Sequence, residues 1–231
     1  MKIIRNERLI RRNRRIGMVT SLVSLVVLGI GMFISLRMQE QFVWVLVTFI
    51  VGFLLTQVSI YYGNRWGRSP RPDEVLDGIL KGLPGNYVLY HYVTPASHLL
   101  IGPAGIWVLL PYALKGTITY QKGRWRVRGG GFWQAYLRFW GQEGLGRPEL
   151  EAEAEIRHLQ KFFGRLLDQD SPPIQALLIF THPQAELQIE ASSPFLALPA
   201  KKVKDFLRRK AKETPLDESS VRALQKALEQ S

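Results

Sequence analysis

The chain has 231 residues, no cysteine and a formal net charge of +12. Without cysteine it can form neither disulfides nor thiolate metal sites. The positive excess lies in the first fifteen residues, where seven Lys or Arg residues face only Glu7, and in the segment 63–142. This asymmetry indicates an anionic neighbour, either phospholipid or nucleic acid.

Two apolar runs follow the basic N-terminus, and each is long enough to cross about 30 Å of hydrocarbon as a helix. A cleaved signal peptide is disfavoured because no small-x-small site follows Leu36. Buried helices of a soluble core are disfavoured because neither run has a polar face. The positive-inside rule therefore predicts an integral, two-helix membrane protein with both termini cytoplasmic. The expected order is a basic arm, two helices and a linker: 1–15, 16–36, 42–62 and 63–72.

The rest of the chain, 73–231, reads as one mixed α/β domain that is large enough for a single core. The expected helices and strands follow from apolar periodicity and from Gly and Pro signals. Helices are expected at 73–83, 201–212, 217–230 and in a long segment that starts at Pro148. Strands are expected at 87–93, 98–101, 105–110, 117–120, 124–128, 174–181 and within 187–198.

The segment from Gly78 to Gln142, which holds most of the strand-like sequence, contains no acidic residue. A sheet core without carboxylates cannot bind Mg²⁺ in the usual way, because hard cations prefer oxygen ligands. His91 and His98 could suggest a metal pair, but histidines that pack or bond to the backbone are favoured because no carboxylate or cysteine stands beside them. No phosphate-loop, nucleophile-elbow or dinucleotide fingerprint occurs.

The stretch Ser97-His98-Leu99-Leu100-Ile101-Gly102-Pro103-Ala104-Gly105, followed by an apolar strand and Lys115-Gly116, resembles the nuclease-related domain (NERD) family. Members typically read Ile-Asp-His, apolar residues, Gly-Pro-Ser-Gly, an apolar strand, Glu-x-Lys and Lys-Gly. The resemblance covers about 73–210. It implies a restriction-endonuclease-like mixed sheet flanked by helices, here preceded by a transmembrane helical hairpin.

The departures from the family pattern fall on its catalytic positions. On the resemblance, the metal-binding Asp falls on Ser97, the Glu on Leu110 and the Lys on Tyr112, and the Gln of the later helix falls on Glu151. Metal nucleases need carboxylates to hold the ion that activates water, and they need a lysine beside the phosphate. Of the acidic set only Glu74 is retained, and Lys115 matches a different position. We therefore expect no metal, no cofactor and no nuclease activity, unless Glu143, Glu151 or Glu155 enters the pocket.

Residues 124–128 (RWRVR) alternate basic and apolar side chains. The arginines could be the solvated face of a strand with Trp125 in the core, which is the favoured interpretation, or they could bind phosphates while Trp133 or Trp140 stacks on bases. Gly129–Gly131 reads as a flexible connection. The aromatic segment 132–140 could form a helix that packs on the sheet, which is favoured, or that rests on lipid.

These observations predict a membrane-anchored, catalytically inactive module that binds or scaffolds nucleic acid or anionic lipid headgroups. The anion-binding candidates are Lys115, Arg124, Arg126 and Arg128. One alternative is a metal-dependent nuclease with a rearranged active site. The other is a protein-interaction module at the membrane surface.

Overall fold

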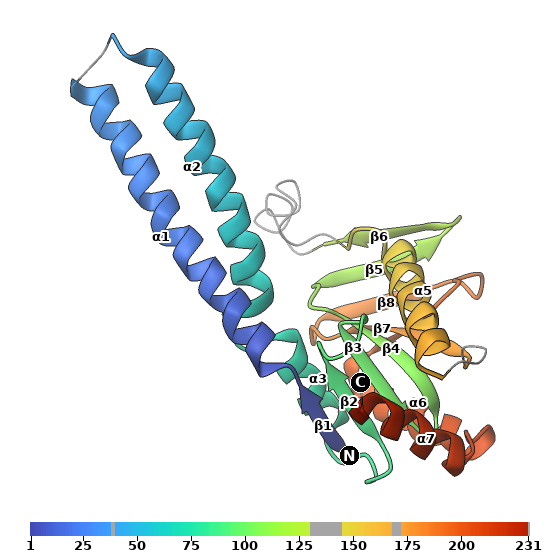
Figure 1. Ribbon diagram of the computed structural model, residues 1–231. Coiled ribbons are helices and arrows are strands. Elements are labelled where there is room, and N and C mark those ends of the chain that lie inside the picture. The colour runs from blue at the N-terminus through green and yellow to red at the C-terminus, as the bar shows by residue number, and fades with distance from the viewer. Residues whose placement is uncertain (38–39, 130–144, 168–171, 231) are drawn as a thin grey trace. The chain divides into compact units, whose positions relative to one another are not determined.

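The computed structural model describes residues 1–37, 40–129, 145–167 and 172–230 (Figure 1). The chain forms two compact units, Glu7–Pro72 and a domain that joins Met1–Asn6 to Asp73–Ser231. The helices are α1 (Glu7–Arg37), α2 (Phe42–Tyr62), the π-helix η1 (Gly63–Gly67), α3 (Pro72–Leu80), α5 (Pro148–Leu167), α6 (Ala200–Glu213) and α7 (Glu218–Gln230). The strands are β1 (Lys2–Arg5), β2 (Val88–His91), β3 (His98–Gly102), β4 (Gly105–Tyr112), β5 (Gly116–Gln121), β6 (Arg124–Arg128), β7 (Ile174–Phe180), β8 (Ala185–Ile189) and β9 (Leu196–Pro199).

The first unit is a hairpin of α1 and α2 (Figure 1), and several small residues lie in its interface. Gly17, Ser24 and Gly31 are buried in α1 at a spacing of seven residues. A Cβ atom on Gly31 would lie 2.4 Å from Thr48 Oγ1 of α2, so the two backbones approach closely there. Ser59 Oγ also donates a hydrogen bond to Gly17 O at 3.2 Å. Small residues and interhelical hydrogen bonds of this kind stabilise helix pairs in lipid.

The outer faces of the hairpin are apolar and exposed. Leu25, Leu36 and Phe42 have exposed fractions of 65%, 72% and 69%. Both helices are long and apolar enough to cross a membrane, and little of their apolar windows is buried within the chain. This exposure argues against helices that belong to a soluble core. Helix α1 begins at Glu7, so most of the basic arm expected over 1–15 is helical.

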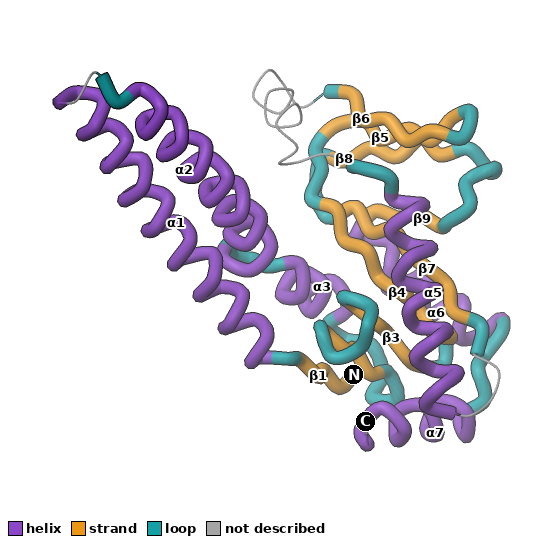
Figure 2. The backbone as a smooth tube through the Cα atoms, turned by 45° about the horizontal axis from the view of Figure 1, so that its top comes forward, coloured by secondary structure: helices purple, strands orange, loops and turns teal. Residues whose placement is uncertain are grey.

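The second unit has the predicted mixed α/β architecture, with helices on both faces of a mixed sheet. The main sheet has the strand order β1-β2-β3-β4-β7-β9, and a smaller sheet has the order β6-β5-β8 (Figure 2). Strand β3 is antiparallel to β2 and β4, whereas β7 is parallel to β4 and β9. Nearly every described strand overlaps a range expected from the sequence, because β-branched and aromatic alternation is a local signal.

Alternate residues of the central strands point to two separate apolar clusters. On β4, Val108 and Leu110 belong to the cluster that contains Ala152, Leu159 and Phe163 of α5. Their neighbours Trp107 and Leu109 belong to the opposite cluster, which contains apolar residues of α3 and α6. This period of two assigns each strand residue to the α5 face or to the α3 face of the sheet.

Strand β1 was not predicted from the sequence. Residues Lys2–Arg5 pair in parallel with Val88–His91 and form one edge of the main sheet. The backbone N–H of Asn6 also donates to His91 O at 3.0 Å. The four residues, of which Lys2 and Arg5 are charged, show no alternation of apolar and polar side chains, so this strand could be recognised only from its pairing with a distant partner.

Candidate functional site

Two glutamates of α5 contact two of the positions that the resemblance marks as catalytic. Tyr112, the last residue of β4, donates a hydrogen bond from its hydroxyl to Glu151 Oε2 at 2.7 Å. Ser97, which precedes β3, donates from Oγ to Glu155 Oε1 at 2.9 Å. Its backbone N–H also approaches the same oxygen at 3.4 Å. Glu151 and Glu155 are four residues apart and therefore lie on one side of the helix.

Local sequence explains why α5 presents these carboxylates to the sheet. Proline 148 is buried at the helix start, where its missing N–H costs nothing. Ala152, Leu159 and Phe163 are fully buried and hold the helix against the sheet. Glu151 and Glu155 flank this apolar stripe, so they reach the ends of β3 and β4 rather than the core.

Electrostatics keep the Tyr112 hydroxyl protonated. Burial raises the pKa of Tyr112 far above its ordinary value, and the nearby carboxylates of Glu151, Glu155 and Glu149 raise it further. A neutral phenol can donate a hydrogen bond, but it cannot supply the positive charge that a lysine at this position would place beside a phosphate. The site therefore has carboxylates and hydroxyl donors, and no cation at the position of the family lysine.

The other positions singled out by the family resemblance are not part of the Ser97–Glu155 and Tyr112–Glu151 pairs. Leu110 shares the α5 face with Tyr112, but it is only 3% exposed and packs in the core. Lys115 is half-buried in the connection between β4 and β5. Glu74 belongs to α3, whose apolar residues pack on the opposite face of the sheet. Glu143 lies outside the described residues.

Within residues 1–37, 40–129, 145–167 and 172–230, no group of three or more His, Asp or Glu residues is placed to hold a metal ion. The structure places Glu155 beside Ser97 and Glu151 beside Tyr112. Two carboxylates are thus present at the site, but each accepts a hydrogen bond from a hydroxyl. The sequence alone identifies Glu151 and Glu155 only as residues that could enter the pocket.

His91 and His98 pack in the interior, which is one of the two arrangements favoured from the sequence, and they contact each other. Their Nδ1 atoms are 2.8 Å apart, and His91 Nε2 lies 3.0 Å from Asp77 Oδ1. Both rings are buried. The pair faces α3 because His91 and His98 occupy the strand positions that alternate away from the α5 face. No local sequence signal joins residues on β2, β3 and α3.

The basic strand β6 has the predicted alternation, with exposed arginines and half-buried Trp125 and Val127. It is the outer strand of the small sheet, and Lys122 and Gly123 form its two-residue turn with β5 at φ values of 52° and 72°. Positive φ at both positions is typical of the type I′ hairpin turn. In the part of the chain that the structure describes, no carboxylate forms an ion pair with Arg124, Arg126 or Arg128.

Lys115 is close in sequence to the end of this strand pair. The following residue, Gly116, has φ of +108°, and a Cβ atom there would lie 2.3 Å from Arg128 O. The chain therefore passes next to the end of β6 immediately after Lys115. Trp133, Trp140 and the aromatic segment 132–140 lie outside the described residues, as do Gly130 and Gly131.

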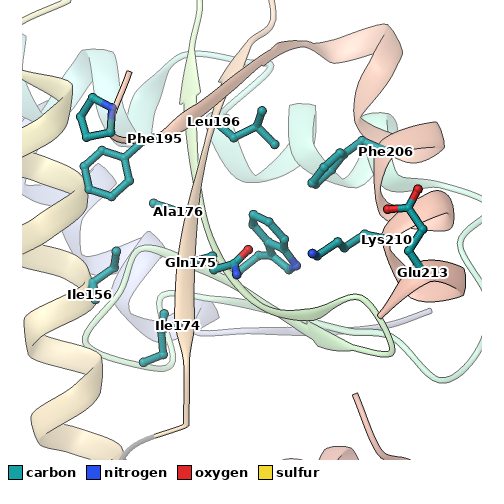
Figure 3. Close-up of a pocket in the computed structure, with 11 residues that line it drawn as sticks. Ile156, Ile174, Gln175, Ala176, Phe195, Leu196, Phe206, Lys210 and Glu213 are labelled. Carbon is teal, nitrogen blue, oxygen red and sulfur yellow. The ribbon is translucent and has the colours of Figure 1, made fainter. Parts of the chain in front are cut away.

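A cavity of about 480 Å³ lies between α5, β7, β9 and α6 (Figure 3). Ile156 lies on one side of the cavity, and Phe206, Lys210 and Glu213 of α6 lie on the other (Figure 3). Its lining includes none of the residues singled out from the sequence as catalytic or anion-binding. The described candidate site is thus separate from this cavity.

Comparison of the chain with protein-family models, curated proteins and solved structures finds no match.

Proposed function

We propose that this chain is a membrane-anchored binding module whose α/β domain, similar to the nuclease-related domain, binds nucleic acid through strand β6. The observation that carries the proposal is the row of three exposed arginines on the outer strand of the small sheet. Alternate residues of a strand are about 6.6–6.8 Å apart, so Arg124, Arg126 and Arg128 present guanidinium groups in a line on one face. Arginine suits phosphate recognition because its planar fork can donate two hydrogen bonds at once.

The neighbouring strands leave this face accessible to an anion. Thr117, Thr119 and Gln121 of β5 are the cross-strand partners of the three arginines. These neutral side chains do not compete for the guanidinium groups. Glu186 of β8 lies beyond them, next to Thr117, and it contributes negative charge near one end of the row. An anionic ligand therefore meets unneutralised positive charge along most of β6.

Membrane anchoring is supported by the exposed apolar surface of α1 and α2. The chain before α1 and the chain after η1 both enter the same folded unit. A hairpin that crosses a bilayer twice returns the chain to its starting side, which agrees with this arrangement. The basic residues of 1–15 and 63–72 favour the cytoplasmic side for both ends.

The proposal includes no catalysis, because the groups at the family's catalytic positions are unsuited to it. Ser97 and Tyr112 are neutral donors that already occupy carboxylate oxygens of α5. Leu110 offers no oxygen. Replacement of a metal-binding carboxylate by a hydroxyl weakens the affinity for a divalent ion, because hard cations prefer charged oxygen ligands.

The binding proposal is tested with the full chain in detergent micelles and with labelled single-stranded and duplex DNA. Affinity should fall with salt with a log–log slope of about −0.7 per contact for single strands and about −0.9 for duplex. Replacing Arg124, Arg126 and Arg128 by Gln should make the slope shallower by up to about 2–3. A matched control replaces Lys201, Lys202 and Arg209, which are exposed on α6, by Gln and should leave the slope unchanged.

Equal slopes for the two triple variants, or no binding to any nucleic acid, would remove strand β6 as a nucleic-acid site. Binding to vesicles of anionic lipid that the β6 variant loses, without binding to nucleic acid, would assign the strand to lipid headgroups instead.

A second function, a metal-dependent nuclease with a rearranged active site, is favoured by one observation, which is the placement of Glu151 and Glu155 beside Tyr112 and Ser97. It predicts Mg²⁺- or Mn²⁺-dependent cleavage that Glu155→Gln abolishes. Glu153→Gln, an exposed change on the same helix, is the control. Intact DNA and RNA after incubation with either metal would eliminate this function.

A further inference from the structure

A buried polar network crosses the α3 face of the main sheet. Arg5 of β1 contacts Asp73 at 3.4 Å and forms a second ion pair with Asp77, both on α3. Asp77 in turn contacts His91 of β2, and His91 contacts His98 of β3. The network thus connects three neighbouring strands to one helix through side chains that are distant in sequence.

The network is shielded from solvent. The side chains of His91 and Asp73 are fully buried, and those of Arg5 and Asp77 are 20% and 23% exposed. The ring of Tyr92, which adopts φ of 58°, packs on His98 with a centroid distance of 4.9 Å. Charges and polar groups in such surroundings are stable only with matched partners, so a change of protonation state is costly.

The distances select the tautomers of both histidines. Asp77 accepts a hydrogen bond, so His91 must carry its proton on Nε2. A neutral His91 then accepts at Nδ1, and the donor facing it at 2.8 Å is the N–H on Nδ1 of His98. Both hydrogen bonds of His91 are therefore formed when both rings are neutral.

Protonation of His91 would disturb two contacts. A proton on its Nδ1 would face the Nδ1 proton of His98, and this contact survives only if His98 changes tautomer. A cationic His91 would also compete with Arg5 for the carboxylate of Asp77 and would repel Arg5. Burial lowers the pKa of His91; Asp77 and Asp73 oppose this shift, and Arg5 adds to it.

Arg5 is the last residue of β1, and α1 begins two residues later. Strand β1 has only four residues and lies at the sheet edge, where it pairs with β2 alone. A short edge strand has few backbone hydrogen bonds, so its attachment depends strongly on side-chain contacts. The ion pairs of Arg5 connect the C-terminal end of β1 to α3.

We propose that Arg5, Asp77, His91 and His98 form a proton-sensitive clasp, which holds β1 on the sheet while both histidines are neutral and releases β1 when the pair takes up a proton. The strand that it controls leads directly into the first apolar helix. The clasp would therefore link the protonation state of the domain to the segment that enters the proposed membrane anchor. It does not depend on nucleic-acid binding.

The pH window follows from linkage. Because the pKa of His91 is lower when the clasp is closed, the closed form binds fewer protons than the open form. Its full stability is present above the ordinary histidine pKa of about 6.5 and is lost as the pH falls below that value. Opening should increase by up to about tenfold for each pH unit in this range.

The absence of cysteine in the chain allows a direct test by thiol labelling of the full chain in micelles. A single cysteine is placed at Ile4, which is half-buried in β1, or at Ile3, which is exposed. The ratio of the two labelling rates at one pH cancels the pH dependence of thiol chemistry. We expect this ratio to be low at pH 7.5 and to rise several-fold at pH 5.5.

In a His91→Gln, His98→Gln background the ratio should be the same at both pH values, even if the basal opening is greater. His158→Gln, an exposed histidine on α5, should retain the full pH response. Two results would overturn the proposal. One is a labelling ratio that does not change with pH when both histidines are present, and the other is a pH-dependent ratio in the His91→Gln, His98→Gln variant.

Ring ¹⁵N NMR of the histidine-labelled chain without substitutions provides an independent test if the double variant fails to fold. At pH 7.5 it should show His91 protonated on Nε2 and His98 protonated on Nδ1. The opposite tautomers, or a cationic His91 at this pH, would contradict the proposal.

Discussion

The substitution Gly102→Ala should destabilise the domain through a single steric contact. Gly102 ends β3 within the Gly-Pro-Ala-Gly turn and pairs with Gly105. A Cβ atom at this position would lie 2.2 Å from Cδ1 and 2.7 Å from Cε1 of Tyr87. The ring of Tyr87 is 2% exposed, so it has little space into which to move. The glycine is thus required by close packing rather than by an unusual backbone angle.

The magnitude follows from this distance. Ordinary carbon contacts begin at 3.4 Å, so the ring or the strand must shift by about 1 Å. Overpacking of this kind costs about 1–3 kcal/mol. For a domain of this size, each kcal/mol lowers Tm by about 2–4 °C, so the expected decrease is about 2–12 °C.

Thermal unfolding of the full chain in micelles, followed by circular dichroism, measures this decrease. Gly78→Ala in α3 is the matched control, because a Cβ atom there meets nothing within 4 Å. Alanine has the higher helix propensity, so the control should stabilise the domain by up to about 1 kcal/mol. A Gly102→Ala variant that melts at or above the Tm of the parent chain would refute the steric argument.

Three further outcomes test the hairpin and the candidate site. Cysteines at Gly31 and Thr48 should form an intramolecular disulfide, because a Cβ on Gly31 would lie 3.1 Å from Thr48 Cβ; a gel-shift assay should detect it in the double variant and in neither single variant. Because the pKa of Tyr112 is raised, its contribution to stability is present below about pH 10 and is lost above it. In thermal melts, the Tm of the Tyr112→Phe variant should therefore fall less between pH 8 and pH 10.5 than the Tm of the parent chain. If the family resemblance is correct, a triple variant with Ser97→Asp, Leu110→Glu and Tyr112→Lys should bind Mn²⁺, which calorimetry can measure. A triple variant that folds but does not bind Mn²⁺ would count against the resemblance.

Local patterns predicted most of the elements of this fold. The alternation of arginines with Trp125 and Val127 is sufficient to predict both β6 and its exposed face, because side chains of a strand point to opposite sides in turn. The two apolar runs predicted the helices of the hairpin because each is long enough to cross a bilayer. The interface of the hairpin, where Gly17, Ser24 and Gly31 are buried at a spacing of seven residues, was not identified from the sequence.

The contacts that define the candidate site and the clasp join residues far apart in the sequence, and no local pattern reports them. Tyr112 and Glu151 are separated by 39 residues, and Ser97 and Glu155 by 58. The acidic start of α5 is typical of a helix N-terminus, and Glu151 and Glu155 could be named as residues able to enter the pocket, but their partners on the sheet could not be identified. Strand β1 was missed for a related reason, since its partner β2 lies more than 80 residues away.

The departures from the family pattern and the glutamates of α5 are physically connected. A carboxylate at position 97 would face Glu155, and the two negative charges would repel each other unless a cation lay between them. A lysine at position 112 would face Glu151. Ser97 and Tyr112 instead donate hydrogen bonds to these glutamates without adding charge. Carboxylates contact Ser97 and Tyr112, whereas exposed positive charge lies on the arginines of β6, and this contrast is the physical reason to place anion binding on that strand.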